Sequence, residues 1–333
     1  MTGKKKYYGI DWLRTIACIG IVLIHTKANT DYIVNGFIYN NAIPLLAYLV
    51  FLFMMISAFG MCYGYFDKVM NGTINWIEFY KKRYLKILPF FVLLIIIDLA
   101  VQFSTSSLME GFTEITLLHG FIPKEFTVIG VGWYLGTVFI FYLIFPFFCV
   151  LISKKYLAWI SFAISIGLHY ICAYHFMLSK DNIIYSLCYF FAGGLIYLYR
   201  ESLAKVKWYV YLPIIICSTL LFFLVSRSVF VVLLLFGSLV SFALSIQRKN
   251  KVVSFISGIS MEIYLSHMLI LRVLEKLHLT TMFGNGLVQF IICVSLEILG
   301  TIIFSYVVQK IINFTIKKIA QIRKRQDLQE KAR

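Results

Sequence analysis

Residues 8–26 have the sequence YGIDWLRTIACIGIVLIHT, an apolar run that carries three ionisable side chains, Asp11, Arg14 and His25. A helix needs about 20 mostly apolar residues to cross the hydrocarbon core of a bilayer. The run is therefore predicted to form a membrane-spanning helix. Ionisable groups inside such a helix are costly, so they usually face a cavity or a polar partner.

Apolar runs of the same kind continue through the chain. The 333 residues are 61% hydrophobic and 14% charged, whereas soluble domains average about 25% charged residues. This composition is typical of a protein embedded in lipid. Ten runs are predicted to span the membrane: 8–26, 43–65, 86–104, 127–153, 156–177, 183–199, 208–226, 228–246, 252–276 and 285–312.

The lysines and arginines predict the orientation of these runs. With the N-terminus inside, 24 of the 31 basic residues lie at the inner ends and loops and six at the outer ones. Basic residues concentrate on the cytoplasmic side of membrane proteins. The pattern predicts an all-α polytopic protein with about ten transmembrane helices and both termini in the cytoplasm. It also explains the net charge of +16 without nucleic acid as a partner.

The loops leave no room for an appended domain. The longest predicted loops, 27–42, 66–85 and 104–126, are too short to fold on their own. Residues 1–333 are therefore predicted to be one transmembrane domain, with a bundle over about 8–312 and a basic cytoplasmic tail over 313–333. The chain has no GxxxxGK phosphate loop, no HExxH and no paired-cysteine site, so no metal is expected. Any chemistry is expected within the bundle or at its mouths.

Arg14 and His25 are predicted to lie on one face of the first helix. Eleven residues at 100° each return the helix to within about 20° of its starting direction, at an axial separation of about 16 Å. Asp11 lies one turn before Arg14 and is expected to pair with it. This face would lead from an acid–base pair near the cytoplasm to an imidazole in the outer part of the membrane.

Other polar residues are predicted at the two ends of the same interior. His267 lies about 20 Å along its helix from the cytoplasm, and Trp133 begins a helix that enters from outside. Both are therefore expected near the depth of His25. At the cytoplasmic end, Arg83 and Lys86 are one turn apart and could hold the phosphates of an anionic nucleotide. Ordinary anchoring of basic residues at the membrane surface explains this pair as well.

Taken in order along the chain, these segments resemble the membrane-bound acyltransferase-3 family. The family patterns are Arg/Lys-x10-His, FxxxSGF, RxxRxxP and SxxSxxIYLxH. In the same order, the matching segments of this chain are Gly9–Arg14 with His25, then Phe53–Phe59, then Arg83–Pro89, and finally Ser257–His267. The stretch Trp133–Pro146 fits too, so the resemblance extends from residue 9 to about residue 275.

The sequence departs from the family patterns at three positions. Ala58 replaces the usual glycine, and Lys86 replaces the second arginine. A lysine still attracts phosphate, although it lacks the bidentate fork of arginine. Val138 stands where many members carry glutamate, so no catalytic carboxylate is expected there.

The resemblance implies an O-acyltransferase that moves an acyl group, usually acetyl from acetyl-CoA, to a hydroxyl of a cell-surface or exported glycan. It also implies a multi-pass protein of the cell membrane, in bacteria the cytoplasmic membrane. His25 would be the general base or would itself be acylated in transit. Arg14, Arg83 and Lys86 would bind the donor. The acceptor-side or supporting residues would be Asp11, Trp133, Glu262, Tyr264 and His267.

Two other functional classes stay open from the sequence alone. A polar cavity between helices also suits a transporter or flippase for a polysaccharide precursor or a small polar solute. The absence of inverted repeats and the cytoplasmic basic pair weigh against it. A membrane sensor or anchoring subunit is the other alternative. The sequence leaves the acceptor, the acyl group and the formation of a homo-oligomer open.

Overall fold

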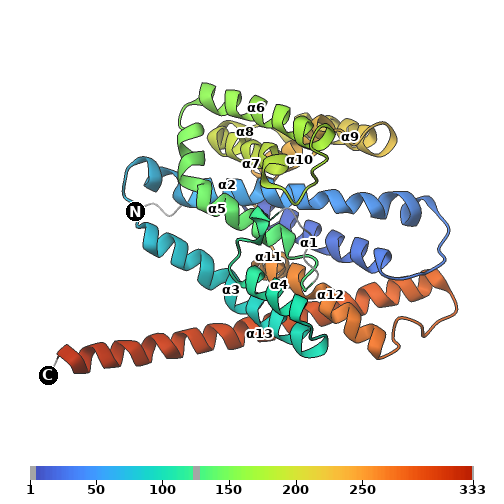
Figure 1. Ribbon diagram of the computed structural model, residues 1–333. Coiled ribbons are helices and arrows are strands. Elements are labelled where there is room, and N and C mark those ends of the chain that lie inside the picture. The colour runs from blue at the N-terminus through green and yellow to red at the C-terminus, as the bar shows by residue number, and fades with distance from the viewer. Residues whose placement is uncertain (1–4, 123–127, 332–333) are drawn as a thin grey trace.

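The computed structural model describes residues 5–122 and 128–331. Lys4 and Lys124, two of the basic residues counted above, and residue 127, the first of the predicted run 127–153, lie outside these ranges, as do the last two residues of the predicted tail. In the described part the chain is all-helical, without a strand, which confirms the predicted fold class (Figure 1). The elements are α1 (Tyr8–Ala28), η1 (Ile38–Ala42), η2 (Ile43–Tyr48), α2 (Leu49–Met70), α3 (Trp76–Val101), α4 (Thr105–Ile115), η3 (His119–Phe121), α5 (Trp133–Leu151), α6 (Lys155–Tyr174), α7 (Ile183–Leu198), α8 (Arg200–Leu203), α9 (Trp208–Leu224), α10 (Val229–Ala243), α11 (Lys251–Gly258), α12 (Ser260–Lys276) and α13 (Gly286–Lys331).

All ten predicted runs coincide with helices. Among the described residues, six helices are long and apolar enough to cross a membrane, and the bent pair α11–α12 makes a seventh. The remaining three, α7, α9 and α10, have 16, 17 and 15 residues, slightly short of the bilayer core. The protein is therefore a polytopic membrane protein. The number of crossings and the cytoplasmic side of the termini stay predictions, although Figure 1 shows both ends on the same side of the bundle.

Two helices, α3 and α13, extend by ten residues or more beyond their predicted boundaries. Helix α3 begins at Trp76, ten residues before the predicted run, because the Asn75 side chain caps it by accepting a hydrogen bond from the Glu78 amide at 3.0 Å. The basic residues around Arg83 therefore lie on this helix rather than before it. Helix α13 continues to Lys331, so residues 313–331 of the predicted tail extend it away from the bundle (Figure 1).

The prediction of one continuous helix over 252–276 is wrong. The chain bends by 70° between α11 and α12, at Gly258 and Ile259. Beside the bend, the Ser260 hydroxyl donates to the Ser257 carbonyl at 2.9 Å. Serine side chains that bond to nearby carbonyls compete with the helical backbone, and glycine weakens it further. The break places irregular backbone inside the bundle, which membrane proteins tolerate where it lines a cavity.

Helix α1 lies at the centre of the bundle and packs against α2, α10, α11, α12 and α13. Its glycines permit this packing. A Cβ at Gly9 would lie 2.1 Å from the Ala243 carbonyl oxygen of α10, and one at Gly20 would lie 2.3 Å from Leu49 Cδ1. Small residues at such crossings let membrane helices approach closely. The central position gives the polar face of α1 access to several other helices.

The predicted loop 104–126 contains a helix of its own, α4, which packs against α3. A capping box between Ser104 and Ser107 begins this helix. The Glu114 side chain is fully buried near its end, where one carboxylate oxygen accepts a hydrogen bond from the Ile129 amide at 3.3 Å. Burial raises the pKa of Glu114 to about 8, because a low dielectric disfavours the charged form.

This raised pKa predicts a pH-dependent stability. The unfolded chain loses the Glu114 proton near pH 4.5, whereas the folded protein retains it up to about pH 8. The folded state thus binds more protons in this window, so stability falls as pH rises through it. Glu114→Gln removes the charge and is expected to raise the unfolding temperature at pH 8 but not at pH 4. Thermal unfolding of the purified protein tests this, with exposed Glu275→Gln as the control. Unfolding temperatures that shift equally at both pH values would contradict it.

Candidate functional site

A cavity of about 130 Å³ opens between α1, α2, α3, α5 and the α11–α12 break. Its charged wall is formed by Arg14 and Lys86, and its aromatic wall by Tyr134, Tyr142 and Tyr264. This volume lies below the range of about 300–1,000 Å³ that is usual for a site enclosing a whole small-molecule ligand. The cavity is therefore a narrow one that suits an extended part of a ligand.

Arg14 supplies a permanent positive charge to this cavity from α1. The guanidinium is half-buried and lies against Gly60 of α2, where an added Cβ would be 3.4 Å from Nη2. Lys86 of α3 is solvent-accessible, and the fields of Arg14, Glu262 and Arg83 act on its ammonium group. Two cations therefore face one narrow space from different helices. This arrangement favours an anionic ligand.

Arg83, predicted to share a ligand with Lys86, does not line the cavity. Its guanidinium lies over three aromatic rings, 4.9 Å from the Tyr65 centroid, 5.4 Å from Tyr142 and 5.7 Å from Phe79. Cations are attracted to the faces of aromatic rings. Aromatic rings, including that of Tyr142, therefore hold the Arg83 guanidinium. The second cation that lines the cavity with Lys86 is Arg14.

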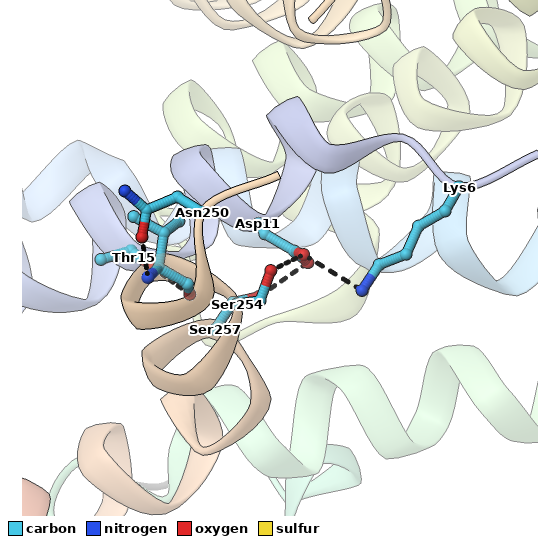
Figure 2. Close-up of polar contacts among 7 residues, drawn as sticks. Lys6, Asp11, Thr15, Asn250, Ser254 and Ser257 are labelled. Atoms are coloured by element: carbon cyan, nitrogen blue, oxygen red, sulfur yellow. Dashed lines mark hydrogen bonds and ion pairs between the residues drawn. The ribbon is translucent and has the colours of Figure 1, made fainter. Parts of the chain in front are cut away.

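The direct pair that the spacing of Asp11 and Arg14 allows does not form, and Asp11 has other partners. Asp11 accepts hydrogen bonds from Ser254 at 3.0 Å and Ser257 at 3.1 Å, and Lys6 lies 3.3 Å from the same carboxylate (Figure 2). These contacts fasten α1 to α11 just before the α11–α12 break. Asp11 therefore positions the helices around the cavity, and its negative charge acts on Arg14 without a direct ion pair.

Glu262, in the first turn of α12, is buried beside the same region. One carboxylate oxygen accepts a hydrogen bond from Gln309 at 2.8 Å, whereas the other is buried without a partner among the described residues. The fields of Glu262 and Lys86 act on one another. Glu262 therefore balances part of the positive charge at this end of α12.

His25 and His267 meet at the far end of the same face of α1. Their ring centroids are 5.0 Å apart in an edge-to-face arrangement. His267 is fully buried, and its Nδ1 lies 2.7 Å from the Tyr264 carbonyl oxygen. A carbonyl only accepts hydrogen bonds, so Nδ1 carries the proton and Nε2 is an acceptor. That Nε2 has no hydrogen-bond partner among the residues described. His25 is half-buried beside it.

Aromatic rings connect the cationic cavity to this histidine pair. Tyr264 lines the cavity, and its ring centroid lies 6.0 Å from that of His267. The Tyr264 hydroxyl donates to the Val131 carbonyl at 2.9 Å, which fixes the ring. Trp133 does not line the cavity, but its ring centroid lies 6.2 Å from that of Tyr134, which does, and Lys180 Nζ lies 5.2 Å from the Trp133 ring centroid. The sequence predicted Trp133, His25 and His267 at a similar depth, but it could not show which of these side chains are in contact.

Glu297 of α13 is a buried ionisable residue that sequence reasoning missed, although it lies within the predicted run 285–312. Its carboxylate is 2.6 Å from the hydroxyl of Thr26, the residue after His25. The pattern that could have identified Glu297 in the sequence is a carboxylate within an apolar run, because such groups are costly in a membrane. Across the described ranges, no three His, Cys, Asp or Glu side chains are grouped so that they could hold a metal ion.

A family profile described as an acyltransferase domain matches residues 7–308, a range that includes Arg14, Lys86, His25 and His267. The chain belongs to the acyltransferase-3 family. No curated protein and no solved structure matches the chain. Membership in this family makes the protein a membrane acyltransferase. The cationic cavity and the histidine pair are therefore considered below as parts of an acyl-transfer site.

Proposed function

We propose that this acyltransferase moves an acetyl group from cytoplasmic acetyl-CoA to a hydroxyl of a cell-surface or exported glycan, across a bacterial cytoplasmic membrane. One observation carries the proposal. A single face of α1 presents Arg14 to a cationic cavity and, about 16 Å along the helix axis, presents His25 to His267.

The donor end of the proposed site is the cavity with Arg14 and Lys86. Coenzyme A carries a pyrophosphate, and charge-assisted hydrogen bonds to guanidinium and ammonium groups suit it. The narrow volume of about 130 Å³ suits the slender pantetheine arm that follows the pyrophosphate. The arm would point the thioester past Tyr264 towards His25.

The acceptor end of the proposed site is the histidine pair. A neutral His25 imidazole takes the proton of the acceptor hydroxyl while its oxygen attacks the thioester carbonyl carbon. The carbon–sulfur bond then breaks, and the proton passes from His25 to the departing thiolate of coenzyme A. An ester and free coenzyme A result, so neither an oxidant nor a further reactant is needed.

His267 acts as a positioning residue in this scheme. The Nδ1–H of His267 donates to the Tyr264 carbonyl at 2.7 Å, so the buried Nε2 of the neutral ring can only accept a hydrogen bond. An N–H of His25 directed at this nitrogen would leave the other His25 nitrogen free to receive the hydroxyl proton. His267 would thus orient the imidazole of His25, as the carboxylate orients the histidine in catalytic triads.

The proposal predicts acceptor-dependent release of coenzyme A. Purified protein in nanodiscs is expected to release free thiol from acetyl-CoA only when a hydroxyl-bearing glycan is present, with one ester formed per thiol. Thiol titration and mass spectrometry of the glycan measure the two products. A panel of neutral and acidic oligosaccharides would identify the acceptor class. Thiol release at an equal rate without any acceptor, or glycan that gains no ester, would contradict the proposal.

A further inference from the structure

A second and larger cavity lies at the end of the bundle where the N-terminal segment begins. Its volume is about 430 Å³, within the range of about 300–1,000 Å³ that is usual for ligand sites. Three cations line it, Lys5, Arg200 and Lys205, together with the acids Asp67 and Glu201. Neither the sequence patterns nor the proposed chemistry uses this cavity.

Tyrosine rings form the walls of this cavity. Tyr7, Tyr63 and Tyr197 line it, and the Tyr7 and Tyr63 centroids are 5.4 Å apart. The Tyr63 hydroxyl donates to the Lys5 carbonyl, which holds the N-terminal segment over the site. Rings of this kind provide stacking surfaces for a nucleobase.

The two acids in the wall are already engaged. Asp67 accepts a hydrogen bond from the Tyr197 hydroxyl at 3.2 Å, and Glu201 lies 3.7 Å from Arg200. Arg200 also donates to the Tyr197 carbonyl at 2.9 Å and lies 4.3 Å from the Tyr197 ring centroid. The guanidinium is thus held in place, while Lys5 and Lys205 are exposed. The wall therefore has one more positive than negative charge.

Two helices join this cavity to the one that contains Arg14. Tyr7 is the residue just before α1, and Arg14 lies in the second turn of that helix, seven positions further along the chain. On α2, Ser57 lines the Arg14 cavity, Gly60 contacts Arg14, and Tyr63 lines the larger cavity. Ser57 and Tyr63 are six residues apart on α2, so less than two turns of this helix, about 9 Å along its axis, separate the two cavities.

We infer that the larger cavity binds the adenosine 3′-phosphate of the acyl-CoA donor. The inference rests on the proposed function and adds a subsite to it. The small cavity takes the pantetheine arm and the pyrophosphate contacts Arg14 and Lys86. The adenine then stacks against Tyr63, the least buried of the three rings, and the 3′-phosphate contacts Arg200 and Lys205. The subsite selects donors by their nucleotide end.

The experiment compares two donors, acetyl-CoA and 3′-dephospho-acetyl-CoA, in the acceptor-dependent assay. A charge-assisted hydrogen bond contributes about 1.5–3 kcal/mol, so wild-type kcat/KM is expected to favour acetyl-CoA by about 10-fold or more. Arg200→Ala and Lys205→Ala are expected to lower this preference towards unity by slowing acetyl-CoA alone. Lys207→Ala, an exposed neighbour outside the cavity, is the control and should retain the full preference.

A binding measurement separates a subsite from a folding defect. Adenosine 3′,5′-bisphosphate should inhibit wild type in competition with acetyl-CoA and inhibit Arg200→Lys more strongly than Arg200→Ala. Equal use of both donors by wild type, or an unchanged preference in Arg200→Ala, overturns the inference while the proposed function stands. Wild-type protein that turns over neither donor overturns the proposed function and the inference with it.

Discussion

His25→Ala is expected to lower kcat for acyl transfer by about 10³-fold, because general base catalysis contributes roughly 10²–10⁴-fold. The KM for acetyl-CoA should change little, since the cationic cavity lies about 16 Å away along α1. Because His25 is half-buried, we expect its replacement by alanine to have only a modest effect on folding. Initial rates at saturating acetyl-CoA, with abundance and unfolding temperature measured on the same preparation, test this.

The matched control for His25 is His175, an exposed histidine at the end of α6. His175→Ala should retain wild-type kinetics. His25→Gln keeps hydrogen-bonding capacity but cannot carry the proton, so it should be as inactive as the alanine variant. An active His25→Ala protein of normal stability would remove His25 from the catalytic role.

Arg14→Ala is expected to raise the KM for acetyl-CoA by about 10- to 100-fold, because charged hydrogen bonds contribute about 1.5–3 kcal/mol. The kcat should fall much less, since Arg14 binds the donor in the ground and transition states alike. Kinetics over a wide range of acetyl-CoA concentrations separate the two constants. Arg14→Lys should lie between wild type and the alanine variant, because it keeps the charge without the fork.

The control for Arg14 is Arg227, an exposed arginine between α9 and α10. Arg227→Ala should leave both constants unchanged. The argument for donor binding at Arg14 would be wrong if Arg14→Ala lowered kcat alone, or if it left the KM for acetyl-CoA at the wild-type value.

Much of the fold follows from patterns within single segments. Each predicted apolar run forms helical structure, although 252–276 is divided into α11 and α12, because a chain that crosses the bilayer core needs about 20 mostly apolar residues. The shared face of Arg14 and His25 follows from helix geometry alone. The resemblance found in the ordered motifs is confirmed by the family profile over residues 7–308.

The errors concern contacts between segments far apart in the sequence. Asp11 has its Ser254 and Ser257 partners in α11, and spacing within α1 could suggest only Arg14. Arg83 lies over rings from other helices and does not line the cavity with Lys86, which its position in the sequence could not show; its role in donor binding stays a prediction. The break at Gly258 depends on competition between side chain and backbone, which hydropathy does not detect. The roles of His25 and the other site residues stay predictions.

The central claim is that one face of α1 connects a donor on the cytoplasmic side to an acceptor on the other side. Proteoliposomes with a glycan acceptor trapped inside, and acetyl-CoA added only outside, test it directly. Molecules with the Arg14 end outward should acetylate the trapped glycan, whereas His25→Ala proteoliposomes should not. Ester formed only when donor and acceptor share one compartment would contradict the claim.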